Sequence, residues 1–351
     1  MLHSLLSGDY PRSRTLSVVL VAILIGLALA PFIFPGTRSL NVAAKVAVFV
    51  LLVASYDLLL GYTGIVSFAH TMFFGIGGYG VGIAMAKMDA GWGALVLGSV
   101  AALGLALAIA LAIGLLSLRV RAIFFAMITL AVASFFQILA SQLSPITGGE
   151  DGLTFRLPEL LRPATVLFSA LGVEVNGRLL SYYLVLFVAL ACFLALLRVV
   201  NSPFGRVLLS IRENEFRSEA LGYRIVTYRT VANCIAALGA TVAGILYAIW
   251  LRYTGPDTTL SFNIMIDILL MVVIGGMGTM YGSVLGATIF VLAQNYLRDL
   301  MKVASDALEG LPLLPALLHP DRWLLWLGVL FILCVYYFPF GIVGKLRAKR
   351  L

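Results

Sequence analysis

Long apolar runs, separated by short polar or charged stretches, dominate this chain of 351 residues. Ten of the runs are close to the roughly 20 residues that an α-helix needs to cross a bilayer. They predict an all-α, polytopic membrane protein, because a spanning helix satisfies its backbone polar groups internally. The predicted spans are residues 16–30, 42–60, 61–86, 92–118, 123–140, 179–200, 231–251, 262–280, 282–297 and 323–338.

The polar stretch at residues 201–229 departs from this pattern in its length and its alternating charges. Apolar residues recur in it at roughly helical spacing, between five arginines and three glutamates. We predict a pair of short amphipathic helices outside the membrane that present a surface to another protein. A solvated connecting loop is the alternative interpretation.

The other long extramembrane stretch, residues 141–178, is rich in turn-forming residues, including Gly148, Gly149 and three prolines. We expect an ordered surface loop with short pieces of helix. Its acidic residues, among them Glu150 and Asp151, can pair with basic groups on a partner. The alternative is a hydrophilic lid without a partner.

Composition excludes a soluble globular domain, since 62% of the residues are hydrophobic and only 11% are charged, against about 25% charged in ordinary domains. The formal net charge of +8 does not indicate a nucleic-acid partner, because the cations cluster at the ends of predicted spans. Cys192, Cys234 and Cys334 lie in apolar runs without metal-ligand spacing and are interpreted as small hydrophobic residues. We treat residues 1–351 as one transmembrane domain, beginning with a span that is retained rather than cleaved as a signal peptide.

Orientation follows from the distribution of basic residues. With ten spans, both termini, the turn at Arg119 and Arg121, and the 201–229 loop fall on the same side, which holds 14 of the 24 lysines and arginines. The positive-inside rule therefore predicts cytoplasmic termini, a cytoplasmic 201–229 loop and an outward-facing 141–178 loop.

Glycines concentrate in the third predicted span, where Gly75, Gly77 and Gly78 formally fit a dinucleotide-binding pattern. That pattern needs a preceding strand and an acidic residue about 20 positions later, and neither is present. Two interpretations remain open: close helix packing, or a broken helix whose backbone lines a cavity. Close helix packing is also predicted at a second set with spacing of four, Gly278, Gly282 and Gly286.

Polar residues inside apolar runs are candidates for a substrate path, because such groups face protein or water rather than lipid. Ser67, His70, Asn263 and Asp267 form this candidate set. A structural, hydrogen-bonded role is the alternative for each of them. Asp57 is a weaker candidate, because near the end of its span a carboxylate can reach water.

Motifs for catalysis are absent from the sequence. Residues 341–345 have the wrong spacing for a nucleotide-binding P-loop, and no H-E-x-x-H or nucleophile elbow occurs. We therefore expect a non-catalytic transport subunit without catalytic, cofactor-binding or metal-binding residues.

The 201–229 loop contains three motifs: Gly205-Arg206, the run Ile211-Arg212-Glu213-Asn214-Glu215, and Glu219-Ala220-Leu221-Gly222. These motifs resemble those of the branched-chain amino acid ABC transporter permeases of the LivM type. Further matches, in the family's order, are residues 61–64, 67–70, 73–79, 143–152, 271–286 and 338–342.

This resemblance implies that the loop holds a coupling helix for an ATPase subunit. The implied coupling residues are Gly205, Arg206, Ile211, Arg212, Glu213, Asn214, Glu215, Glu219, Ala220 and Gly222. It also implies a bacterial inner-membrane importer with a homologous second permease as a heterodimer, two ATPase subunits that bind ATP and Mg²⁺, and a periplasmic substrate-binding protein at the 141–178 loop.

Substrate and mechanism leave alternatives open. The resemblance favours branched-chain amino acids, while related permeases serve urea, short amides, and aromatic or other carboxylic acids. An ion-coupled secondary transporter that uses Asp57, His70 and Asp267 is a competing mechanism. A channel-like pore is disfavoured, because no selectivity ring of charges is visible.

Overall fold

The computed structural model describes residues 13–33, 36–117, 122–163, 165–170, 173–307, 319–338 and 341–348. Within these ranges, eight helical segments are long and apolar enough to cross a membrane. Two further helices, α4 (His70–Lys87) and α14 (Met280–Ala307), pack among them. The predicted all-α polytopic architecture is confirmed.

Each predicted span overlaps one helix of the structure for most of its length. Leucine, alanine and other residues compatible with helix fill these segments. In chain order the helices are α2 (Arg14–Ile33), α3 (Thr37–Asp57), α4, α5 (Trp92–Ser117), α6 (Ala122–Gln142), α8 (Gly177–Val200), α11 (Ile225–Leu251), α13 (Phe262–Gly275), α14 and α16 (Trp323–Tyr337).

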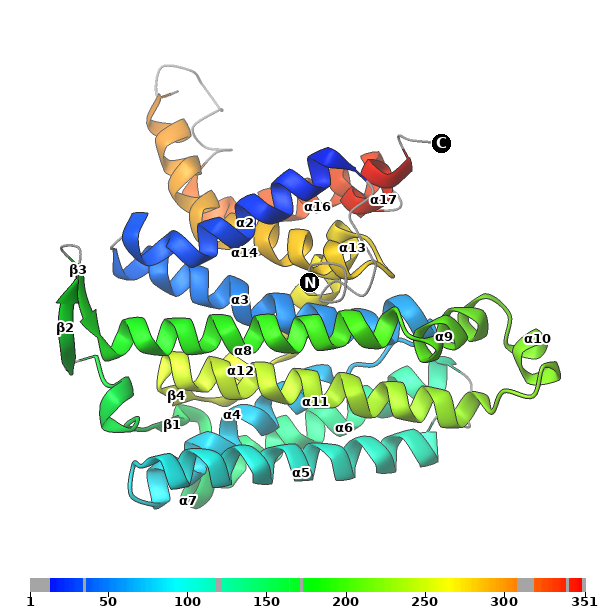
Figure 1. Ribbon diagram of the computed structural model, residues 1–351, viewed down its shortest axis with the longest axis horizontal. Helices are drawn as coiled ribbons and strands as arrows, with labels where there is room; N and C mark the ends of the chain where they lie inside the picture. The colour runs from blue at the N-terminus through cyan, green and yellow to red at the C-terminus, as the bar shows by residue number, and fades with distance from the viewer. Residues whose placement is uncertain are drawn as a thin grey trace.

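Helix α3 lies at the centre of the bundle, in contact with α8, α11, α13 and α14 (Figure 1). Nearly every side chain from Val42 to Asp57 is buried. Helices α2, α5, α6 and α16 instead keep many large apolar side chains exposed. Exposed apolar surface on this scale is typical of helices that face lipid.

Close packing joins α4 to α11. A Cβ atom at Gly77 would overlap the carbonyl of Thr241, and one at Gly244 would overlap the carbonyl of Phe74. Glycine at both positions lets the two backbones touch, which is how small residues stabilise helix crossings in membranes. Because α4 runs without interruption from His70 to Lys87, the structure favours the packing interpretation at Gly77.

The helix is interrupted before the glycine-rich part of this region, not within it. Helix α3 continues as a π-helix, η1 (Leu58–Thr63), and residues 64–69 are not helical, so the predicted span at 61–86 begins as a helix only at His70. The backbone N–H groups of this segment find partners: Ile65 donates to the Leu59 carbonyl (3.2 Å) and Phe68 to Thr129 Oγ1 (3.0 Å). Irregular backbone is tolerated at such a depth when the protein supplies these bonds.

The 141–178 loop contains strands that were not predicted. It holds α7 (Ser144–Thr147), η2 (Gly149–Asp151), β1 (Leu153–Thr154), η3 (Glu159–Leu161), β2 (Val166–Ala170) and β3 (Val173–Asn176). β2 and β3 form an antiparallel hairpin, while β1 pairs with β4 (Tyr253–Thr254), with Leu153 opposite Thr254. A short helix, α12 (Pro256–Thr259), follows β4.

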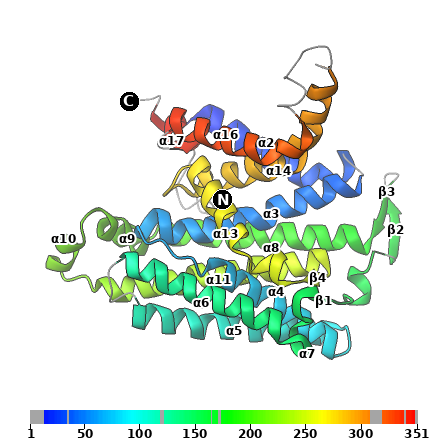
Figure 2. The same ribbon diagram turned by 180° about the vertical axis from the view of Figure 1, so that it is seen from behind.

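The two loop regions lie at opposite ends of the bundle. The helices α9 (Pro203–Glu213) and α10 (Glu215–Ala220) project from one end, while β1 to β4 and α7 lie at the other (Figures 1 and 2). Helix α17 (Gly341–Ala348), which follows η4 (Pro320–Arg322) and α16, lies at the end that carries α9. At this end the start of α2 packs on it, since buried Leu16 clusters with Leu285 and Val343.

Part of the orientation argument lies outside the described residues. Arg12, the turn at Arg119 and Arg121, Lys349 and Arg350 are among the residues that the structure does not describe, as are Pro339 and Phe340 of the last matching motif. The cytoplasmic assignment of the α9 and α10 end therefore stays a prediction from charge.

Candidate functional site

The 201–229 segment folds as the predicted pair of short helices. Pro203 occupies the first turn of α9, where its missing N–H costs no hydrogen bond. Asn214 separates the helices and caps α10, with its Oδ1 accepting from the backbone N–H of Arg217 at 2.9 Å. Gly222, at φ 90°, reverses the chain after α10 in a conformation that favours glycine.

One face of α9 fastens the pair to the bundle. Leu208 and Ile211 are fully buried, and Gly205 leaves no room for a Cβ atom against the carbonyl of Val200. The ring of Phe204 stacks on Tyr228 of α11 with the centroids 5.7 Å apart. Helix α9 is thus packed firmly against the bundle.

Two exposed apolar side chains lie on α10 and at the residue that follows it. Phe216 is 82% exposed and Leu221 is 68% exposed, beside the exposed charges of Glu213, Arg217 and Glu219. Exposed large apolar residues rimmed by charge mark protein-interaction surfaces. We call Phe216, Leu221 and these three charged residues the α10 surface.

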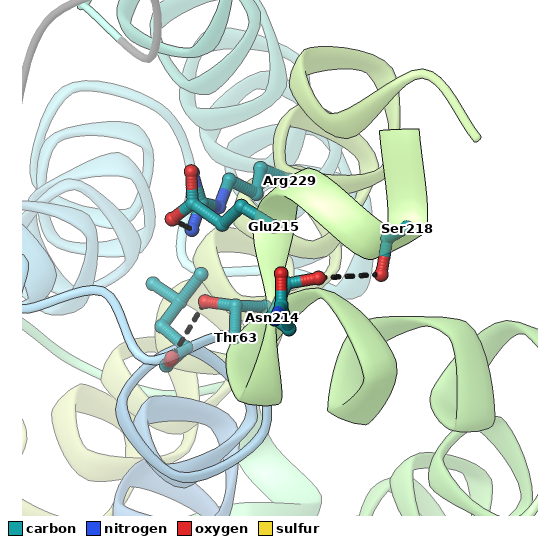
Figure 3. A network of polar contacts seen from close by, with 6 residues as sticks. Thr63, Asn214, Glu215, Ser218 and Arg229 are labelled. Carbon is teal, nitrogen blue, oxygen red and sulfur yellow. Dashed lines mark hydrogen bonds and ion pairs between the residues drawn. The ribbon is translucent and has the colours of Figure 1, made fainter. Parts of the chain in front are cut away.

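Polar contacts hold α10 against its neighbours (Figure 3). The carboxylate of Glu215 forms an ion pair with the guanidinium of Arg229 on α11. Ser218, which is buried, donates to the carbonyl of Asn214 (3.1 Å) and shares a hydrogen bond with Ser210 of α9 (2.9 Å). These bonds tie the two short helices into one unit.

Arg212, at the end of α9, connects this unit to the interrupted end of α3. Its Nη1 donates a hydrogen bond to the carbonyl of Gly61 in η1, and its side-chain carbons lie against Gly64. The same place is tied to the turn between α13 and α14, because Asp57 Oδ1 accepts from the backbone N–H of Gly278 at 2.8 Å. We call Asp57, Gly61, Arg212 and Gly278 the helix-end junction.

The junction corrects two sequence-based expectations. Asp57 does not reach water, since it is fully buried. Gly278 is not on a helix face with Gly282 and Gly286, because it lies in the turn before α14 with φ 77°. Gly61 is required here, because a Cβ atom would overlap both Asp57 Oδ1 and the backbone of Gly278.

The remaining predicted packing glycines lie at close approaches. A Cβ atom at Gly286 would overlap the carbonyl of Met271 on α13, and at Gly282 it would approach the Gly276 carbonyl at 2.8 Å. Gly75 lies against Leu260, and a Cβ atom at Gly78 would come within 2.9 Å of Thr254 Oγ1.

The predicted substrate-path residues divide into two groups. His70 and Ser67 are buried; His70 Nε2 lies 2.9 Å from Ser55 Oγ, and its ring lies edge-on to Tyr56. Ser67 Oγ accepts a long bond, 3.4 Å, from the Ala69 N–H. These contacts are those of a hydrogen-bonded structural residue, the alternative noted for His70.

Asn263 and Asp267 instead lie on a more open face of α13. Asn263 is exposed and Asp267 is partly exposed. Asp267 Oδ2 accepts from Gln294 Nε2 on α14 at 3.3 Å, and Gln294 Oε1 accepts from Lys45 Nζ on α3 at 2.7 Å. No hydrogen bond links Ser67 or His70 to Asn263 or Asp267 within the part of the chain that the structure describes.

Lys45 and Gln294 were not among the predicted site residues. Lys45 lies about 12 Å along the axis from the start of α3 and about 18 Å from its end, at a rise of 1.5 Å per residue. It therefore lies in the first half of its helix, just after the polar segment that ends at Asn41. Its position as the fourth residue of the predicted span 42–60 was the available signal, since a charge within a span is costly.

Comparison with known proteins agrees with this architecture. The family described as "Branched-chain amino acid transport system / permease component" matches residues 38–335. The chain belongs to this family. No solved structure matches the chain.

Two relatives of this permease cover most of its length. "High-affinity branched-chain amino acid transport system permease protein LivM" of Escherichia coli (strain K12) is 27% identical over an alignment of 319 residues that covers 86% of this chain and 73% of the relative. "Probable branched-chain amino acid transport permease protein LivM" of Methanocaldococcus jannaschii is 27% identical over an alignment of 295 residues that covers 80% of this chain and 81% of the relative. The resemblance noted from the loop motifs is confirmed, and the permease is a multi-pass membrane protein.

Proposed function

We propose that this permease is the membrane subunit of an ABC importer for branched-chain amino acids. A periplasmic binding protein delivers the substrate, a homologous second permease completes the translocation path, and two ATPase subunits supply the energy. ATP and Mg²⁺ bind to those ATPases, and this chain acts as a non-catalytic subunit of the bacterial inner membrane.

The α10 surface is the observation that carries the proposal. Exposed Phe216 and Leu221 are suited to an apolar cleft of a partner, and the charges around them set its register. A free connecting loop would not need two large apolar side chains in water. The ATPase therefore docks on α10, with α9 as the base that holds it.

The helix-end junction supports a route for the motion. A displacement of α9 moves Gly61 through its hydrogen bond with Arg212. The displacement then reaches the turn between α13 and α14 through the hydrogen bond between Asp57 and Gly278. Single π-helical turns often occur at functional sites. Hydrolysis then rocks α3, α13 and α14 between outward-open and inward-open states.

The test compares uptake in vesicles that contain this permease, its partner permease, the ATPases and the binding protein. Wild type is expected to accumulate leucine only with ATP. Phe216→Asp/Leu221→Asp is expected to reduce uptake to less than about a tenth, since central apolar contacts dominate protein interfaces. The amount of ATPase subunit that copurifies with the permease is measured in parallel. This amount is expected to fall together with uptake.

Met88→Asp is the matched control, because Met88 is an exposed apolar residue that follows α4, away from the α10 surface. It is expected to leave uptake unchanged. Uptake that ignores ATP and follows a proton or sodium gradient would overturn the ABC assignment in favour of an ion-coupled transporter. ATP-driven activity with urea, an amide or an aromatic acid, but without leucine, would keep the mechanism and change the substrate.

A further inference from the structure

Three side chains from three helices meet on the open face beside α13. Lys45 of α3, Gln294 of α14 and Asp267 of α13 form a chain of hydrogen bonds, with Gln294 in the middle. Each is only partly buried. Lys45 is further held by the ring of Phe49, 5.5 Å from its Nζ to the ring centroid.

The orientation of the Gln294 amide follows from the chemistry of its neighbours. The ammonium of Lys45 can only donate, and the carboxylate of Asp267 accepts. The amide oxygen must therefore face Lys45 and the amide nitrogen must face Asp267, as observed. Gln294 thus presents an acceptor to the cation and a donor to the anion.

An α-amino acid presents the same two groups, in charged form, on a single carbon. Its carboxylate accepts from an ammonium, and its own ammonium donates to a carboxylate. Charge-assisted bonds of this kind are roughly twice as strong as neutral ones. A zwitterion is therefore able to replace the neutral amide between Lys45 and Asp267.

This polar face is not suited to lipid. Asn263, Ile266 and Asp267 fall on one side of α13, at spacings of three and four residues, and Asn263 is exposed. Lys45 and Asp267 lie in helical segments that are long and apolar enough to cross a membrane. Charges within such segments face water or protein, because exposure to hydrocarbon is costly. Ile266, 40% exposed beside Asp267, offers an apolar contact for an aliphatic side chain.

A second pair of opposite charges lies further along the same helices. Arg38 is seven residues before Lys45 on α3, two turns away and on the same face. Its Nη1 lies 2.6 Å from Asp299 Oδ2 of α14, and the two side chains are 58% and 53% exposed. The Arg38–Asp299 pair therefore lies about 10 Å from Lys45 along α3, toward the end of the bundle opposite α9.

We infer that Lys45 and Asp267 form a half-site for the zwitterionic head of an α-amino acid, which displaces the Gln294 amide as the substrate passes. Lys45 binds the carboxylate, Asp267 binds the ammonium, and the second permease closes the site. This inference rests on the proposed function and adds the substrate's head group to it.

A purely structural role makes a different prediction from a binding role. If the three residues only tie α3, α13 and α14 together, then removing any one of them breaks the same chain and has the same effect. If the substrate replaces Gln294, the two charged residues are needed for uptake and the amide is not.

The first experiment measures leucine uptake in the same vesicles for Lys45→Met, Asp267→Asn and Gln294→Ala. Each charge variant is expected to lower uptake about tenfold or more, the loss that follows when a charge-assisted hydrogen bond is removed. Gln294→Ala is expected to keep uptake at the wild-type level or above. Lys302→Met and Asp306→Asn, at exposed positions of α14, serve as controls for the change of charge.

The second experiment detects binding without transport. In a background with Cys192, Cys234 and Cys334 replaced by alanine, Asn263→Cys places a thiol one turn from Asp267 in the assembled permease pair. Leucine is expected to slow its reaction with a maleimide, while leucinamide and 4-methylpentanoic acid, which each lack one charge, are not. Adding Lys45→Met is expected to abolish the protection.

Equal losses in all three uptake variants, or no loss in the two charge variants, would overturn the inference. So would protection by leucinamide or the acid as strong as that by leucine. The labelling assay needs neither ATP nor the ATPases, so ATP-independent uptake would overturn the proposed function while the labelling still decides the inference.

Discussion

At the scale of single residues, Asp57 illustrates how a buried acid can serve the backbone instead of a solute. Its carboxylate is fully buried, and Oδ1 accepts from the Gly278 N–H. Arg212 contacts the adjacent Gly61 carbonyl. Both bonds join helix ends, so they connect elements that are more than 150 residues apart in the chain.

We expect Asp57→Asn to preserve uptake and Asp57→Ala to impair it. Asparagine still offers an oxygen to Gly278, whereas alanine leaves that N–H without its acceptor, at a cost of about 1–3 kcal/mol. Thermal unfolding of the purified permease pair and leucine uptake check the prediction. Equal loss in both variants, together with uptake that depends on an ion gradient, would indicate instead that Asp57 carries a coupling ion.

The sequence was sufficient to select Asp57, His70 and Asp267 as unusual, because a polar group within an apolar run stands out. Their roles required the fold. His70 meets Ser55 of α3, and Asp267 meets Gln294 of α14, and no local pattern identifies partners in other helices. Lys45 was passed over for the same reason, since its partners come from α13 and α14.

At the scale of elements, the α9 and α10 pair was predictable and the strands were not. Apolar residues at helical spacing predicted both short helices. β1 and β4 contain two residues each and pair across about a hundred positions. Strands of that length have no alternation to detect, so only the approach of the two loops in space reveals them.

The loop around η2 yields a prediction about docking. Glu150 and Asp151 are exposed on η2, so Glu150→Lys/Asp151→Lys is expected to raise several-fold the binding-protein concentration that half-maximally stimulates ATPase activity. Reversal of charge repels a basic partner surface, and the effect should shrink in high salt because exposed charges are screened.

Asp306→Lys, an equivalent change at an exposed position of α14, controls for net charge in this experiment. This variant is expected to leave the half-maximal binding-protein concentration unchanged. A loop that acts only as a lid would give an unchanged half-maximal concentration in the double variant as well.

At the scale of the whole molecule, the bundle has two chemically different ends. α9, α10 and α17 lie together at one end, and the strands and α7 lie at the other (Figures 1 and 2). The helix-end junction connects the first end to α3, and the Lys45, Gln294 and Asp267 chain lies between the ends along the same helix. Under the proposed mechanism, a motion that starts at α9 is expected to reach the face on which substrate binds.

The orientation of these ends is testable by labelling. In the cysteine-free background, Phe216→Cys is expected to react with a membrane-impermeant maleimide only in inverted vesicles. Glu150→Cys is expected to react only in right-side-out vesicles. The physical reason for both results is that positively charged segments stay on the cytoplasmic side. The reverse labelling would place the α10 surface outside and remove it as an ATPase site.

The sequence by itself determined the membrane architecture, the helix pair and the family, because apolar length, helical periodicity and local motifs are all properties of neighbouring residues. The tertiary structure alone decided the π-helical end of α3, the contact of Arg212 with Gly61, the strand pairing and the meeting of Lys45, Gln294 and Asp267. Each of these depends on which helices lie side by side. That arrangement is set by packing over the whole bundle, with close approach permitted at positions such as Gly61 and Gly77.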